Sequence, residues 1–212
     1  TGFTGMVGSH LADFLIENTD WNIIGFSRWI ESFENVSHLI PRINSEDRIS
    51  VIYGDMNDFS SIESALRKNR PDFIFHLAAQ ASVPLSLKNF YDSSSNNLLS
   101  SIKVFELSKK YSAPVIYASS SAVYGNLFLG NDQLDKISIL SPYAQDKITT
   151  ESYAKMSNII FKLSSVGLRF FNVYGPGQTA DSPYSAVIPI FIKRMLKNLP
   201  VNINGGFQTR DF

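Results

Sequence analysis

The chain has 212 residues, with 19 basic and 19 acidic side chains and no cysteine. The balanced charge gives no sign of a nucleic-acid or acidic-lipid surface, and the lack of cysteine excludes disulfides and thiolate metal sites. The longest apolar stretches, such as residues 72–81, are far shorter than a membrane span, and no secretory signal is visible at the start. We therefore expect a cytoplasmic protein with one sizeable core, without nucleic-acid, membrane or metal partners.

The chain begins with a glycine pattern, Gly2, Gly5 and Gly8, followed at once by an apolar-periodic run from Leu11. The pattern predicts a tight turn that opens a helix. Glycine lets the backbone approach a ligand closely, and a helix N-terminus offers N–H groups to a phosphate. The competing interpretation is a glycine-rich turn that binds nothing. A strand normally feeds a phosphate-binding turn, so we expect the sequence to be a fragment cut after its first strand, and cut again at its end.

Strand and helix patterns then alternate to the end of the chain. The predicted strands cover residues 22–26, 48–53, 72–77, 114–118 and 166–171. The predicted helices lie near residues 33–40, after residue 58, and over residues 91–110 and 142–162. This alternation predicts an α/β fold, a doubly wound parallel sheet with right-handed crossovers.

In such a sheet, ligands bind outside the carboxyl ends of the strands, so polar residues at these ends are candidates for a site. Asp55 follows the second predicted strand and is either an acceptor for an adenine amino group or a turn residue beside the next helix. His76 ends the third strand, and a packed histidine is favoured there over a catalytic one. The serines at 119–121 follow the fourth strand, and their position favours a site over a simple turn.

Tyr143 and Lys147 are spaced i and i+4, so they share one face of a predicted helix. A free tyrosine has a pKa of roughly 10, and a nearby ammonium, helped by an oxidised nicotinamide ring, favours the phenolate and lowers that pKa. A tyrosine tuned in this way takes a proton from a hydroxyl group and returns it. The spacing is common by chance, but it is informative after a glycine turn and a serine-rich strand end in this order.

The segments TGFTGMVGSHL, GDMND, HLAAQ, SSSAVYG, SPYAQDK, GLRFFNVYGPGQ and GGFQTRDF span the chain. In these segments the chain resembles the extended short-chain dehydrogenase/reductases, in the NAD-dependent epimerase/dehydratase branch that acts on nucleotide sugars. The resemblance implies an NAD(P)-binding Rossmann domain over residues 1–175 and the beginning of a substrate-binding region over residues 176–212. It also implies a homodimer that pairs through the two long helices.

The resemblance implies roles for individual residues. Ser120 is the catalytic Ser/Thr, Tyr143 the acid/base, and Lys147 its activator. The implied cofactor-binding residues are Gly2, Thr4, Gly5, Met6, Val7, Gly8, Ser27, Arg28, Asp55, Met56, Leu77, Ala78, Ala79, Gln80, Asn97, Tyr143 and Lys147. The implied binding residues for a nucleotide-diphosphate sugar are Ser82, Ser120, Ser121, Asn172 and Arg210.

Two departures from the family pattern bear on the cofactor and the reaction. Members that bind NAD usually carry an Asp at the end of the second strand for the ribose hydroxyls, whereas this chain has Ser27 followed by Arg28. A missing carboxylate beside a cation suits the 2′-phosphate of NADP, although Arg28 packed over the adenine would fit either cofactor. Dehydratases of the family carry acidic residues after the catalytic Ser/Thr, where this chain has Ser121 and Ala122.

We therefore expect an NAD(P)-dependent isomerase, a UDP-hexose 4-epimerase that works through a transient 4-keto sugar. The alternatives are an NADPH-dependent 4-ketosugar reductase and a relative of GDP-mannose 4,6-dehydratase. A non-catalytic dinucleotide-binding sensor is the alternative of another class, and a complete set of Ser120, Tyr143 and Lys147 counts against it.

Overall fold

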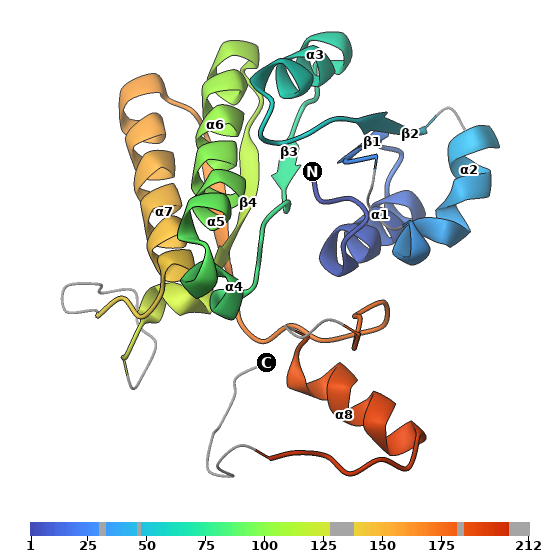
Figure 1. Ribbon diagram of the computed structural model, residues 1–212. Coiled ribbons are helices and arrows are strands. Elements are labelled where there is room, and N and C mark those ends of the chain that lie inside the picture. The colour runs from blue at the N-terminus through green and yellow to red at the C-terminus, as the bar shows by residue number, and fades with distance from the viewer. Residues whose placement is uncertain (30–32, 46–47, 128–137, 182–184, 204–212) are drawn as a thin grey trace.

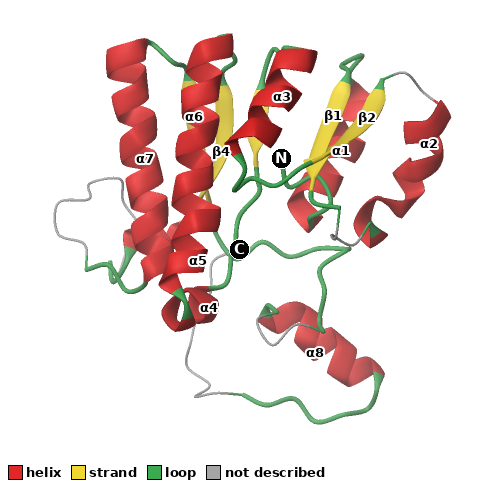
Figure 2. Cartoon of the chain, turned by 45° about the horizontal axis from the view of Figure 1, so that its top comes forward, coloured by secondary structure: helices red, strands yellow, loops and turns green. Residues whose placement is uncertain are grey.

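The computed structural model describes residues 1–29, 33–45, 48–127, 138–181 and 185–203. Strands and helices alternate along these residues, and helices lie on both faces of the strands (Figures 1 and 2). The elements are α1 (Met6–Asn18), β1 (Ile23–Ser27), the 3₁₀ helix η1 (Glu34–Leu39), α2 (Ile40–Ser45), β2 (Ile49–Tyr53), α3 (Phe59–Asn69), β3 (Ile74–His76), α4 (Val83–Lys88), α5 (Phe90–Ser94), the π-helical turn η2 (Ser95–Leu99), α6 (Ser100–Tyr111), β4 (Val115–Ser120), the 3₁₀ helix η3 (Ser121–Tyr124), α7 (Pro142–Phe161), β5 (Ser165–Phe170) and α8 (Val187–Leu196).

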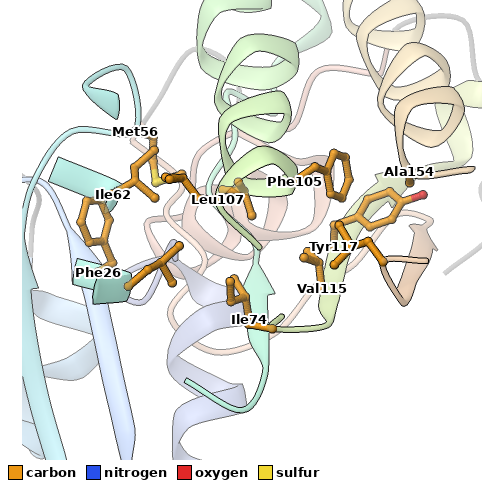
Figure 3. Close-up of a cluster of buried hydrophobic side chains, with 13 residues drawn as sticks. Phe26, Met56, Ile62, Ile74, Phe105, Leu107, Val115, Tyr117 and Ala154 are labelled. Atoms are coloured by element: carbon orange, nitrogen blue, oxygen red, sulfur yellow. The ribbon is translucent and has the colours of Figure 1, made fainter. Parts of the chain in front are cut away.

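The strands form two parallel sheets, β1-β2 and β3-β4-β5. Alternation along β1 and β2 sends successive side chains to opposite faces. Phe26 and Ile52 join a core cluster with α3, α6 and α7, whereas Ile23 and Ile49 join a second cluster with α1 and η1. Figure 3 shows the larger of these two clusters. Helices thus cover both faces, and the expected doubly wound α/β class is confirmed.

A groove of about 600 Å³ separates the two sheets. It is lined along its length by β1 and β3, with α1 and α3 on its sides. Thr1 lines this groove, and Figure 2 shows the N-terminus between β1 and β3. The Thr1 nitrogen donates to the Phe75 carbonyl at 2.7 Å, and the Thr1 carbonyl accepts from the Leu77 N–H at 3.3 Å. This is the hydrogen-bond pattern of a parallel strand, so Thr1 is held in register with His76.

Local capping signals explain where several helices begin. Asp58 accepts hydrogen bonds from the N–H groups of Ser60 and Ser61 at the start of α3. Ser141 accepts from the Ala144 N–H at the start of α7, where Pro142 occupies the first turn. None of the helices in the described ranges is long and apolar enough to cross a membrane.

The predicted helix over residues 91–110 is divided in the structure. α5 and α6 are joined by η2, a π-helical turn, so the segment runs from Phe90 to Tyr111 with one wide turn in it. The predicted helix near residues 33–40 is a 3₁₀ helix that leads into α2. α4, η3 and α8 were not predicted. The two proposed domain ranges remain a prediction.

Candidate active site

The glycine turn packs tightly against its surroundings at two of its three glycines. Gly2 has φ +71°, and a Cβ there would lie 2.7 Å from the Ala78 nitrogen. A Cβ on Gly8 would lie 2.1 Å from the Gly2 carbonyl oxygen. The Gly5 N–H closes the turn on that same carbonyl at 3.1 Å. Gly5 is the exposed N-cap of α1, so Met6, Val7 and Gly8 form the first helical turn, whose N–H groups have no partner within the helix.

Residues 2–8, the glycine turn with the first turn of α1, are called the glycine cradle below. The glycine cradle fits the pyrophosphate of a dinucleotide, because such a group requires close approach of the backbone and a helix N-terminus. Thr4 lies within it, and its hydroxyl is 3.3 Å from the hydroxyl of Ser27 at the end of β1. Both side chains are buried, so this contact joins the glycine turn to the next strand end. Arg28 follows and is exposed.

Asp55 at the end of β2 takes part in a turn, and its contact with a cofactor stays a prediction. The Asp55 carboxylate accepts from the Asn57 N–H at 2.8 Å, while Asp58 is the residue that caps α3. Asp55 is exposed at the carboxyl end of its strand, a position that also faces the edge where ligands bind. Met56 is buried in the larger core cluster, and its contact with a cofactor stays a prediction.

The loop after β3, residues 77–80, is fixed by Asn97 on η2. The Asn97 side chain accepts from the Gln80 N–H at 2.8 Å and donates to the Gln80 carbonyl at 3.0 Å. Asn97 is 1% exposed, so it serves as a buried clamp on this loop. Leu77 and Ala78 are half-buried and Ala79 is exposed at the same strand end, next to Gly2.

His76 is a packed histidine, as the sequence favoured. It is buried, and its ring nitrogens lie 2.9 Å from the Thr1 hydroxyl and 3.1 Å from the Ser101 hydroxyl. Burial lowers the pKa of His76 to about 3, so the ring is neutral at physiological pH.

Ser120, Tyr143 and Lys147 meet where β4 ends against α7. The Ser120 side chain lies close enough to the Tyr143 hydroxyl to oppose the rise of the Tyr143 pKa, and the Lys147 ammonium lies 5.7 Å from the Tyr143 ring centroid. Lys147 donates to the Ala118 carbonyl on β4 at 2.7 Å. The Ser120 hydroxyl in turn accepts from the Ala122 N–H at 3.1 Å. The three residue types that the sequence singled out are therefore assembled at one strand end.

Burial dominates the pKa of Tyr143 in the chain alone. It raises this pKa above its ordinary value, and Ser120 opposes that rise. The Lys147 ammonium donates to the Ala118 carbonyl, and the lowering expected from Lys147 together with an oxidised nicotinamide stays a prediction for the enzyme with bound cofactor. Burial also lowers the pKa of Lys147 to about 8.

A charged network that the sequence did not reveal supports this strand end. Arg169 on β5 forms two hydrogen bonds with Glu151 on α7, at 2.9 and 2.8 Å. Glu151 also accepts from the Ser119 hydroxyl at 2.5 Å, and the Arg169 guanidinium lies 4.9 Å from the Tyr124 ring centroid. These contacts tie α7, β4, β5 and η3 together around Ser120.

The remaining predicted substrate residues are spread around the same edge. Ser82 caps α4 by accepting from the Leu85 N–H at 3.2 Å, and Ser121 is half-buried at the start of η3. Asn172 is exposed just beyond β5. Arg210 lies outside the described residues. Within the described ranges, no cluster of acidic and histidine side chains could hold a metal ion.

Parallel strands with helices on both faces, a glycine cradle and a Ser–Tyr–Lys set at the strand ends define the class of Rossmann-type dinucleotide-binding enzymes. The model of the NAD dependent epimerase/dehydratase family matches residues 1–212. The chain belongs to that family.

Three relatives illustrate the similarity. A putative UDP-glucose 4-epimerase of Methanocaldococcus jannaschii is 33% identical, over 100% of this chain and 67% of that protein. The solved UDP-N-acetylglucosamine 4-epimerase of Methanobrevibacter ruminantium, in complex with UDP-N-acetylmuramic acid, is 36% identical with a TM-score of 0.86, over 100% of this chain and 66% of that one. The UDP-glucuronic acid 4-epimerase of Bacillus cereus, solved with UDP-glucuronic acid and NAD, is 28% identical with a TM-score of 0.85, over 100% of this chain and 67% of that one. The chain thus spans about two thirds of the length of these relatives.

Proposed function

We propose that the protein is an NAD(P)-dependent nucleotide-sugar 4-epimerase that inverts C4 of a UDP-hexose through a transient 4-keto sugar. The proposal is carried by one observation: Ser120, Tyr143 and Lys147 lie together at the end of β4. The glycine cradle contacts the loop that follows the neighbouring strand, β3. The three relatives described above, each named as a 4-epimerase of a UDP-sugar, support the same reaction.

Each residue of the set has a distinct task in this proposal. Tyr143 takes the proton of the C4 hydroxyl and later returns it, which is general acid–base catalysis. Ser120 holds the same oxygen by a hydrogen bond and orients it. Lys147 supplies a positive charge that favours the phenolate of Tyr143. A bound NAD(P) would supply the acceptance and return of hydride at C4.

Ser121 and Ala122 favour epimerisation over dehydration. Both follow Ser120 in η3, and the Ala122 N–H is used in a hydrogen bond to the Ser120 hydroxyl. Elimination of water across C5 and C6 requires a general acid at this place, and neither side chain can donate a proton in that way. A 4-ketosugar reductase would use the same Ser–Tyr–Lys set and is the second candidate.

The proposal is tested by incubating the full-length protein with NAD⁺ and three substrates in turn: UDP-glucose, UDP-N-acetylglucosamine and UDP-glucuronic acid. We expect at least one to be converted to its C4 epimer, detected by chromatography and proton NMR. Consumption of NADPH with a 4-ketosugar, in the absence of any epimer, would instead support the reductase. If neither reaction occurs while the cofactor binds, a dinucleotide-binding sensor becomes the better account.

We expect Arg28 to contribute to cofactor choice. It is exposed directly after buried Ser27, at the end of β1 where the adenosine ribose of a dinucleotide binds. A contact with a 2′-phosphate is charge-assisted, so Arg28→Ala should weaken NADP⁺ binding about tenfold and leave NAD⁺ binding nearly unchanged. Isothermal titration of both cofactors measures the ratio. An equal effect on the two would make Arg28 a packing residue.

We also propose that the protein is a cytoplasmic homodimer that pairs through α5–α6 and α7. These helices lie side by side on one face of the sheet (Figure 2), and they carry exposed apolar side chains such as Tyr91 on α5 and Ile160 on α7. Light scattering of the purified protein tests the pairing, and a monomer at micromolar concentration would rule it out.

A further inference from the structure

A buried carboxylate lies on α7 between Tyr143 and Lys147, and the proposed proton transfer does not use it. Asp146 is 3% exposed, and one of its oxygens accepts from the Ser94 hydroxyl on α5 at 2.7 Å. Its second oxygen is also buried and has no hydrogen-bond partner among the described residues. Burial of a charged group is costly unless another charge or hydrogen bonds compensate for it, so we looked for the group that compensates for the Asp146 carboxylate.

Lys147 is a buried positive charge next to Asp146 in the sequence. It is 4% exposed, and its ammonium donates to the neutral Ala118 carbonyl. Burial disfavours the charged form of each residue, whereas each residue's charge favours ionisation of the other. Successive residues of a helix do not face each other, so this attraction acts across the packed interior rather than through a direct contact.

The other titratable groups around Asp146 and Lys147 are either neutral or paired with another charged side chain. His76 on β3 is buried and uncharged, and burial raises the pKa of Tyr117 on β4 to about 12, which keeps it neutral. Glu151, one turn further along α7, is held by Arg169 on β5. The α5 and η2 elements contribute the neutral side chains of Ser94 and Asn97: Ser94 donates a hydrogen bond that favours an ionised Asp146, whereas the Asn97 amide donates to the Gln80 carbonyl and the Ser93 hydroxyl.

We propose that Asp146 is a positioning residue whose carboxylate keeps the buried Lys147 ammonium charged beside Tyr143. The inference deepens the proposed function, on which it depends for the catalytic task of Lys147. Through Ser94 the same carboxylate also holds α7 against the helix that carries Asn97, and Asn97 clamps the loop at Gln80. Asp146 thus contributes both to the charge of Lys147 and to the position of the loop at residues 77–80, next to the glycine cradle.

The decisive variant is Asp146→Asn, which keeps the size of the side chain and an acceptor for Ser94 but removes the charge. Loss of the negative neighbour disfavours the ammonium, so the pKa of Lys147 should fall by about one unit. The pKa is measured by NMR titration of protein labelled with ¹³C at the lysine ε-carbon. The Lys147 signal is assigned by its absence from Lys147→Met. An unchanged Lys147 pKa in Asp146→Asn would overturn the proposal.

Ser94→Ala is the matched control, because it removes the hydrogen bond to Asp146 and keeps the carboxylate. We expect the Lys147 pKa to stay at its wild-type value in this variant, whereas an equal fall in both variants would show that only the packing of α7 matters and would overturn the proposal. If Asp146→Asn fails to fold by circular dichroism, Asp146→Ser provides the same test with a smaller side chain. The titration needs no substrate, so it remains decisive even if no UDP-sugar is epimerised.

Discussion

Replacing Tyr143 by Phe is expected to lower kcat about 10²- to 10⁴-fold while leaving cofactor affinity nearly unchanged. The Tyr143 ring is 8% exposed and packs at the start of α7, and Phe keeps that ring. What is lost is the hydroxyl next to Ser120, which is the proposed proton carrier. Steady-state kinetics with the UDP-sugar that proves active, together with calorimetric titration of the cofactor, separates chemistry from binding.

Tyr153→Phe is the matched control for this experiment. Tyr153 lies on the same helix but is 37% exposed, away from the strand end that carries Ser120. It should retain wild-type turnover. A Tyr143→Phe enzyme with near-normal turnover would show that another group moves the proton.

Replacing Gly8 by Ala is expected to weaken dinucleotide binding at least about tenfold and to lower the melting temperature. The added Cβ would lie 2.1 Å from the Gly2 carbonyl oxygen and 3.1 Å from the Phe3 Cα, and both are backbone atoms. Overpacking of this kind costs about 1–3 kcal/mol, and the turn must move to relieve it. Because that turn is the proposed pyrophosphate cradle, the movement also displaces its N–H groups.

Gly175→Ala serves as the control, because a Cβ at that position would have no atom within 4 Å. Its affinity for NAD⁺ and its melting temperature should match those of the wild type. Titration calorimetry and thermal unfolding followed by circular dichroism measure both quantities. If Gly8→Ala bound NAD⁺ as tightly as Gly175→Ala, the glycine turn would not be the cofactor cradle.

The sequence predicted well those elements that are determined by residues close to one another along the chain. The apolar runs between turn residues gave the strands to within a few residues, and the helix starts expected after Asp58 and at Pro142 are confirmed by the structure. The i, i+4 spacing placed Tyr143 and Lys147 on one face of α7, where the structure has both side chains buried.

The features that the sequence did not reveal depend on contacts between distant segments. Arg169 and Glu151 are 18 residues apart and meet only because β5 and α7 pack together. The wide turn η2 has no compositional signal, yet it carries Asn97 to the loop at Gln80. The sequence also could not give the direction of the Tyr143 pKa shift in the chain alone. This direction depends on how deeply Tyr143 is buried and on the contact that the Lys147 ammonium makes with the Ala118 carbonyl.

The most direct test of the proposed reaction follows the hydrogen on C4 of the sugar. The full-length protein is incubated with a UDP-hexose carrying deuterium at C4, and the product is analysed by NMR and mass spectrometry. The account predicts the C4 epimer with the deuterium retained at C4, because the hydrogen that leaves this carbon returns to it. Loss of the label to solvent, or formation of a 4-keto-6-deoxy sugar in place of the epimer, would contradict it.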